Sequence, residues 1–198
     1  TFILHSADLF LAFFRMQDIP EYIADSADVY ADIRIKTLLP RKEVKIRDSI
    51  LEEQRRMELE EARRAEPGRI AAFMKANGLQ AAPRPSGLIY IETRPGTGKT
   101  IAKGSTVTLH YTARLTDGKI IETSLKEEAI KSGIFDTLFD YTPFTFVMGD
   151  GATVEGWEEG VSCMRRGGKA ILIVPASLAY GEEGLEDLIP PWSPVIYE

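Results

Sequence analysis

The spacing of apolar residues changes within the C-terminal part of the chain, and the change predicts a helix followed by a strand. Apolar residues first recur every three or four positions, on one face of a short helix: Val154, Trp157, Val161 and Met164. Gly167 and Gly168 are expected to end this helix, with Arg165 and Arg166 in its last turn, where positive charge complements the helix dipole. The uninterrupted apolar run 170–174 then predicts a strand that is buried on both sides.

Apolar and polar residues alternate strictly over 106–115, which predicts one strand with a buried face and a wet face. Asp117 and Gly118 suit a hairpin turn, so 120–124 is expected to return antiparallel. Similar signals predict further elements: strands at 88–93 and 144–148, and at least one helical turn within 125–141. A short helix laid across several antiparallel strands is an α+β arrangement.

Charged residues dominate 41–65, and acidic residues repeatedly precede basic ones by four positions, the favourable order on a helix. We expect a long solvated helix here, interrupted by Pro67 and Gly68 and followed by a second short helix over 69–77. A helical spacer is favoured over a partner-binding helix, because a run of charges is usually a solvated face. The composition of 81–87 marks a linker, so 41–86 is interpreted as a helical connector and linker.

An internal similarity links the two ends of the chain, because residues 1–10 align without a gap on residues 170–179. Both stretches begin with an apolar, strand-like run, and the alternation over 29–35 predicts another strand. We therefore interpret 1–40 as the C-terminal part of a second, divergent copy of the unit 154–198.

The composition excludes several classes of function. A net charge of −6 and a pI near 5.1 argue against a nucleic-acid partner, since such binding is built mainly from lysine and arginine at phosphates. The single cysteine, Cys163, excludes an intrachain disulfide and a cysteine-cluster metal site. Residues 97–100 resemble part of a phosphate-binding loop, but Thr93 stands where that motif needs its first glycine, so nucleotide binding is rejected.

Several separated motifs stand out in the C-terminal part of the chain: HYTARLTDGKIIETS (110–124), PFTFVMGDG (143–151), VEGWEEGVSCMRRGGKA (154–170), and PASLAYG with LIPP (175–181 and 188–191). In order and spacing they resemble those of the FKBP-type peptidyl-prolyl cis-trans isomerases. The resemblance covers about 87–198 and implies a twisted antiparallel sheet wrapped around a short helix, with a hydrophobic pocket between them. It also implies rotation about X–Pro bonds without a cofactor or a metal.

The resemblance places the pocket on these residues: Tyr111, Glu122, Phe144, Val154, Trp157, Tyr180, Ile189 and Tyr197. It implies that Trp157 forms the floor and that three aromatic rings form the walls. The Tyr180 hydroxyl and the Val154 backbone N–H are implied to donate to substrate carbonyls. Taken one at a time, the buried aromatic residues would more often be ordinary core, and the resemblance alone singles them out.

Three features depart from the usual FKBP pattern. Glu122 replaces an aspartate, Ile121 replaces the aromatic residue just before that acid, and 125–142 is longer than in the common form. A pocket role for Glu122 and a place as a solvated carboxylate at a strand edge both remain open. The insertion is expected to cap the site or to alter which proteins approach it.

The chemistry of prolyl isomerisation suits an aromatic pocket without a nucleophile. Rotation about the X–Pro bond has a barrier of about 18–20 kcal/mol because the amide loses its resonance, and no bond is broken. Removing water from the amide disfavours its dipolar planar form more than the twisted transition state. The first hypothesis is therefore an isomerase for X–Pro bonds in unfolded or partly folded protein chains, with a site that also accepts macrolide inhibitors. The alternative is a chaperone or interaction module with weak or no isomerase activity.

The N-terminal copy lacks the residues that the resemblance requires. Leu11 stands in the place of Tyr180, and Glu21 replaces the second proline of LIPP, so this copy is expected to be inactive and to bind, scaffold or form a homodimer through the N-terminal arm. Tandem FKBP-like chains with helical spacers are similar to exported bacterial folding factors. This similarity implies the bacterial periplasm or cell envelope, with the cytoplasm as the alternative.

Overall fold

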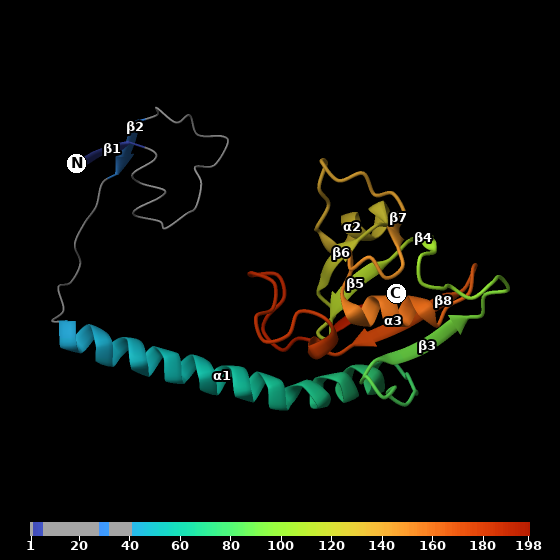
Figure 1. Ribbon diagram of the computed structural model, residues 1–198, viewed down its shortest axis with the longest axis horizontal. Helices are drawn as coiled ribbons and strands as arrows, with labels where there is room; N and C mark the ends of the chain where they lie inside the picture. Colours follow the sequence, from blue (N-terminus) through green and yellow to red (C-terminus); the bar gives the residue numbers. More distant parts are fainter. Residues whose placement is uncertain (1, 6–27, 32–40) are drawn as a thin grey trace. The chain divides into compact units, whose positions relative to one another are not determined.

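The computed structural model describes residues 2–5, 28–31 and 41–198, and the chain divides into two compact units, Thr1–Ile50 and Leu51–Glu198 (Figure 1). In the first unit, β1 (Phe2–His5) pairs antiparallel with β2 (Asp28–Ala31). The expected strand at the start of the chain is therefore confirmed, and the expected strand 29–35 is present as far as Ala31. The rest of the proposed divergent copy lies outside the described residues.

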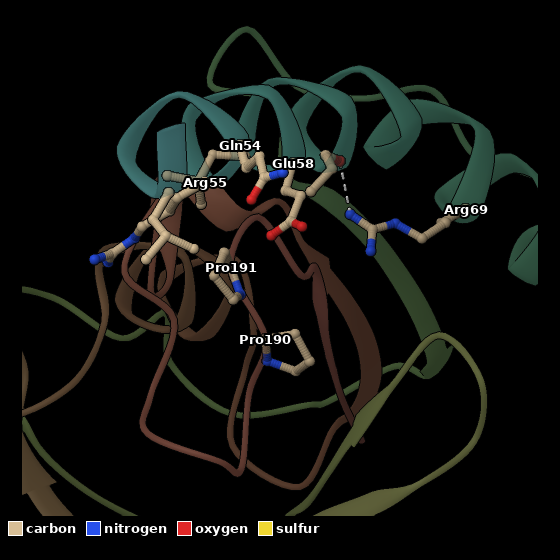
Figure 2. A pocket seen from close by; sticks show the side chains of 9 residues that line it. Gln54, Arg55, Glu58, Arg69, Pro190 and Pro191 are labelled. Atoms are coloured by element: carbon tan, nitrogen blue, oxygen red, sulfur yellow. Dashed lines mark hydrogen bonds between the residues drawn. The ribbon is translucent and has the colours of Figure 1, made fainter. Parts of the chain in front are cut away.

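Helix α1 (Arg41–Ala76) runs through Pro67 without a break, so the expectation of two separate helices was wrong. A proline inside a helix removes one backbone donor, and a carbonyl one turn earlier loses its partner. The Arg69 guanidinium folds back along the helix and donates to the Ala62 carbonyl at 3.0 Å (Figure 2), next to the Arg63 carbonyl that Pro67 leaves without its helical donor. Among the helices of the described residues, none is long and apolar enough to cross a membrane.

The second unit contains one larger and one smaller antiparallel sheet. The larger sheet has the order β3-β8-β9-β5-β6. Its strands are β3 (Ile89–Arg94), β8 (Lys169–Val174), β9 (Val195–Tyr197), β5 (Thr112–Leu115) and β6 (Ile120–Thr123). The smaller sheet pairs β4 (Thr106–Leu109) with β7 (Phe144–Val147). The expected α+β class, with a short helix on an antiparallel sheet, is confirmed.

The expected single strand over 106–115 is wrong, because β4 and β5 belong to different sheets. The chain changes partners at Tyr111, whose N–H donates to the Ser124 hydroxyl at 2.9 Å. Immediately afterwards the Thr112 N–H donates to the Glu198 carbonyl at 3.0 Å. Tyr111 is nevertheless buried on the same side as Val107, as the alternation predicted, and it stands at the corner between the two sheets.

Helix α3 (Glu155–Ser162) packs on β8 and contributes Trp157 and Val161 to the core. Two glycines one turn apart permit a close approach. A Cβ atom at Gly156 would lie 2.2 Å from Val174 Cγ1, and one at Gly160 would lie 2.4 Å from Leu172 Cδ1. A larger residue would push the helix away from the sheet at Gly156, whereas at Gly160 the Leu172 side chain would have to move.

Helix α3 ends earlier than expected, at Ser162 rather than at Gly167 and Gly168. The Cys163 N–H donates to the Gly160 carbonyl at 3.1 Å, a bond over three residues that tightens the last turn. The backbone that follows is engaged elsewhere, since the Arg166 carbonyl accepts from the Thr97 and Gly98 N–H groups at 3.2 and 3.3 Å. Arg165 and Arg166 therefore lie beyond the helix and not in its last turn.

The end of α1 covers the second face of the larger sheet. Phe73 is buried in a cluster with Ile89, Ile173 and Ile196, one residue from each of three neighbouring strands. The Glu66 carboxylate also accepts the Ala176 N–H at 2.5 Å. This part of the helix therefore belongs to the same packed unit as the sheet and is more than a spacer.

The region after β6 contains the expected helical turn, as α2 (Lys126–Ser132), which ends at Gly133 in a left-handed conformation with φ of 74°. A short 3-10 helix, η2 (Ala176–Leu178), follows β8 and leads into the loop that carries Tyr180.

Candidate active site

Trp157 lies at the base of a cluster of aromatic rings and is only 5% exposed. Its ring centroid is 4.9 Å from that of Tyr111 and 4.6 Å from that of Tyr197, and both rings stand at 89° to the indole plane. Phe144 and Phe146 approach from β7 at 6.3 and 6.5 Å. Rings from the corner before β5, from β9 and from β7 thus surround the indole that α3 presents, which gives an apolar box with edge-to-face contacts.

Three further predicted site residues, Val154, Tyr180 and Ile189, pack against the same cluster. Ile189 is 2% exposed, and its backbone N–H and carbonyl both bond to Leu185, at 3.0 and 2.8 Å. Tyr180 is half-buried and precedes Gly181, whose φ is +58° and whose N–H donates to the Ala176 carbonyl at 2.8 Å. These backbone bonds give both loops a defined path beside the aromatic rings.

Glu122 is exposed, yet its carboxylate accepts the Tyr111 hydroxyl at 2.5 Å. The acid at the edge of β6 is therefore bonded to a ring of the aromatic cluster. Burial, and after it the hydrogen bond to Glu122, raises the pKa of Tyr111 above its ordinary range. Burial, followed by the proximity of Tyr180, raises the pKa of Tyr197 in the same direction. Both rings thus stay neutral at ordinary pH.

Two N–H groups beside the rings have no acceptor among the described residues. Val154 is the N-cap of α3, and its carbonyl accepts from Trp157 and Glu158, but no hydrogen bond of the described residues uses its own N–H. The Trp157 Nε1 atom is buried and unpaired within the same part of the chain. An unpaired buried donor costs about 1–3 kcal/mol, so the Trp157 Nε1 group is a source of instability within the described residues.

A sequence model of the FKBP-type peptidyl-prolyl cis-trans isomerases matches residues 97–198. The chain belongs to this family. The family and the enzyme class expected from the sequence motifs are confirmed by this match, which spans the whole aromatic cluster.

Named FKBP relatives cover the same region. An FK506-binding protein of Neisseria meningitidis is 34% identical over 112 residues, which are 57% of this chain and 91% of the relative. FK506-binding protein 4 of Dictyostelium discoideum is 37% identical over 114 residues, but these are 58% of this chain and only 27% of that longer protein. The crystal structure of a peptidyl-prolyl cis-trans isomerase from Pseudomonas syringae pv. tomato is similar with a TM-score of 0.54 and 29% identity, over 70% of this chain and 89% of that one.

Two residues that contact the aromatic cluster were not singled out from the sequence. Phe146 stacks on Phe144 with ring centroids 5.6 Å apart and also contacts Trp157. Its position two residues after Phe144 on a strand was the available signal, since such residues share a face. Ser124 is 1% exposed, and its hydroxyl accepts the Tyr111 N–H. A single serine after a strand does not indicate such a bond in the sequence.

Helix α1 braces the loop that carries Ile189. The Arg69 guanidinium donates to the Trp192 carbonyl at 2.6 Å, and the Arg63 guanidinium lies 5.1 Å from the centroid of the Trp192 ring. Figure 2 shows the concavity that results, with Pro190 and Pro191 facing the side chains of α1 across a volume of about 600 Å³. This hollow lies on the other side of the loop and contains none of the predicted pocket residues.

Proposed function

We propose that the FKBP domain accelerates rotation about X–Pro bonds in unfolded or partly folded protein chains, and that the aromatic box around Trp157 holds the prolyl ring. The observation that carries this proposal is the arrangement of the Tyr111 and Tyr197 rings, both at 89° to the buried indole. The rings around the indole are apolar, which suits contact with a compact saturated ring. Macrolide inhibitors of the kind named in the relatives are proposed to bind the same place.

The proposed mechanism is non-covalent. Entry of the prolyl ring would remove water from the adjacent amide, and the planar dipolar amide loses more from this than the twisted amide does. The Val154 N–H and the Tyr180 hydroxyl would donate to substrate carbonyls. Glu122 would act through Tyr111, whose ring it fixes by the hydrogen bond at 2.5 Å. Only interactions that strengthen in the transition state raise the rate, so these donors must bond the twisted form best.

The test is the isomerisation rate of a short X–Pro peptide with the full chain and three variants. Trp157→Leu and Tyr180→Phe should lower kcat/KM, because they remove the floor and a donor. Tyr90→Phe is the matched control, since Tyr90 is a half-buried tyrosine of β3 that is not a predicted pocket residue. Circular dichroism checks that each variant is folded. Equal rates for the Tyr180→Phe and Tyr90→Phe variants would remove the Tyr180 hydroxyl from the mechanism.

A chain-holding or interaction function remains the second candidate, favoured by exposed apolar side chains on α1. Ile46, Ile50 and Met57 are 50%, 51% and 63% exposed. Suppression of aggregation of a denatured protein by the Tyr180→Phe variant measures this function separately from isomerisation. Loss of both isomerisation and aggregation suppression in this variant would argue against a holding function that does not use the pocket.

We further propose the three-part organisation expected from the sequence: a degenerate FKBP-like segment at 1–40, a helical connector at 41–86 and the isomerase domain at 87–198. Its supports are the similarity of 1–10 to 170–179 and the FKBP match at 97–198. Homodimer formation through the N-terminal arm belongs to the same proposal, and sedimentation of the full chain and of 87–198 tests it. The bacterial periplasm or cell envelope, with the cytoplasm as the alternative, is tested by cell fractionation.

A further inference from the structure

The segment between β6 and β7 exposes a concentration of large apolar side chains. Six of the thirteen such side chains among the described residues lie within the fifteen residues 125–139. We call this set the insertion patch: Leu125, Ile130, Ile134, Phe135, Leu138 and Phe139. Leu138 is 90% exposed, so its side chain packs against almost nothing within the described residues.

The aromatic part of the insertion patch is held in a fixed arrangement. The Phe135 and Tyr141 rings stack with centroids 5.5 Å apart, and Phe139 meets Tyr141 edge to face at 5.0 Å. The Tyr141 hydroxyl accepts the Asp136 N–H at 2.8 Å, and the Lys126 ammonium lies 5.5 Å from the centroid of the Phe135 ring. Phe135 and Phe139 nevertheless remain 41% and 45% exposed. Rings that are ordered before binding lose little entropy when they bind.

The insertion patch borders the proposed prolyl site on both sides in the chain. It begins just after β6, which carries Glu122, and it ends just before β7, which begins at Phe144. Phe139, the last residue of the patch, precedes Phe144 by five residues, so their Cα atoms are at most about 18 Å apart. An extended polypeptide with its proline in the box would pass this distance within about five or six residues.

We propose that the insertion patch binds an apolar or aromatic segment of the substrate chain, a few residues away from the proline, and thereby selects X–Pro bonds in apolar stretches of non-native proteins. This inference rests on the proposed isomerase function. The substrate is the occupant that suits this place, because a polypeptide substrate continues beyond the box and the patch adjoins, in sequence, the strands that carry Glu122 and Phe144. Flat aromatic and flexible aliphatic surfaces accept many apolar sequences, as an enzyme with varied protein substrates requires.

The experiment compares the full chain with the double variant Leu138→Ser/Phe139→Ser. Two peptides share one X–Pro core and differ in a five-residue extension, which contains phenylalanine and leucine in one peptide and serine and glycine in the other. We expect the wild type to favour the apolar extension by about tenfold in kcat/KM, and the double variant to bring this ratio close to one. Val147→Ser is the matched control, because Val147 is 40% exposed on β7, on the opposite face from Phe144 and Phe146, and should leave the ratio unchanged.

Binding of the labelled apolar peptide, followed by fluorescence anisotropy, separates this inference from the proposed function. If no peptide is isomerised but the double variant alone loses affinity for the apolar peptide, the isomerase proposal fails and the insertion patch still binds chains. A wild-type ratio near one, or a ratio that survives in the double variant, overturns the inference. If the wild type is dimeric and the double variant is monomeric with an unchanged ratio, the patch is instead an interface between copies of this chain.

Discussion

The close approach of α3 to β8 depends on Gly156 and Gly160, and adding a methyl group at each should have different consequences. A Cβ atom at Gly156 would meet Val174 Cγ1 at 2.2 Å, together with the Leu178 Cβ and carbonyl oxygen at 3.1 and 3.2 Å. Val174 is fully buried and β-branched, so it has few rotamers with which to yield. A Cβ atom at Gly160 would meet only the end of the Leu172 side chain, with its nearest atom at 2.4 Å.

The magnitudes follow from two opposing effects. Overpacking a filled core costs about 1–3 kcal/mol, and alanine in place of glycine inside a helix stabilises by about 1 kcal/mol. Gly156→Ala should fall at the upper end of the cost and gain little, because Gly156 lies in the first turn. We expect it to lower the free energy of unfolding by about 2–3 kcal/mol, and Gly160→Ala by about 1 kcal/mol or less.

Urea unfolding of the full chain measures both values, and the peptide isomerisation rate reports whether Trp157 has moved with α3. Gly68→Ala is the matched control, because Gly68 lies in α1 with open space where its Cβ would be. This control should stabilise the chain by about 0.5–1 kcal/mol. A Gly156→Ala variant as stable as the wild type, or less affected than Gly160→Ala, would refute the packing argument.

Three further changes test the supports of the site. Arg69→Met should lower the free energy of unfolding, measured in urea, by about 1–2 kcal/mol, because the Trp192 carbonyl loses its donor. Full stability in this variant would show that the bond between Arg69 and Trp192 does not stabilise the chain. Ser124→Ala should cost about 1–3 kcal/mol by the same assay, since the buried Tyr111 N–H loses its acceptor; a smaller cost for the variant would mean that the corner is held by other bonds. The pKa of Tyr197 is raised in the folded chain, so the unfolded chain loses this proton first and the free energy of unfolding should fall as pH rises above about 10. Tyr197→Phe should flatten that fall, and an unchanged pH slope would contradict the raised pKa.

The sequence predicted the order of the elements well but not the places where the chain changes partners. Apolar and polar residues alternate through Tyr111 because Val107 before it and Tyr111 itself are buried on the same side, although β4 and β5 lie in different sheets. A period of two records which side of a strand is buried, but it carries no information on which strand is the neighbour. The hydrogen bonds of Ser124 and Glu198 decide the change, and their partners are distant in sequence.

Helix ends were predicted less well for a related reason. Pro67 was expected to break α1, but the helix continues through it, and packing of Phe73 on the sheet stabilises the turns beyond it. The apolar spacing of α3 suggested a helix as far as Met164, while a tight last turn ends it at Ser162. Both outcomes depend on tertiary contacts, which local spacing does not contain.

The predicted site residues were identified through motif resemblance and not through periodicity. The structure brings Tyr111, Phe144, Trp157 and Tyr197 into one cluster and bonds Glu122 to it. No sequence pattern distinguished these rings from ordinary core aromatics, because a binding pocket and a core use the same residue types. Their roles in catalysis remain a proposal.

The most direct test of the isomerase account is the isomerisation rate of a short X–Pro peptide with the full chain, with and without an FK506-type macrolide. The account predicts acceleration that the macrolide abolishes, since both would occupy the box above Trp157. Loss of acceleration in a folded Trp157→Leu variant would tie the rate to that box. A folded wild-type chain that leaves the rate unchanged would contradict the account.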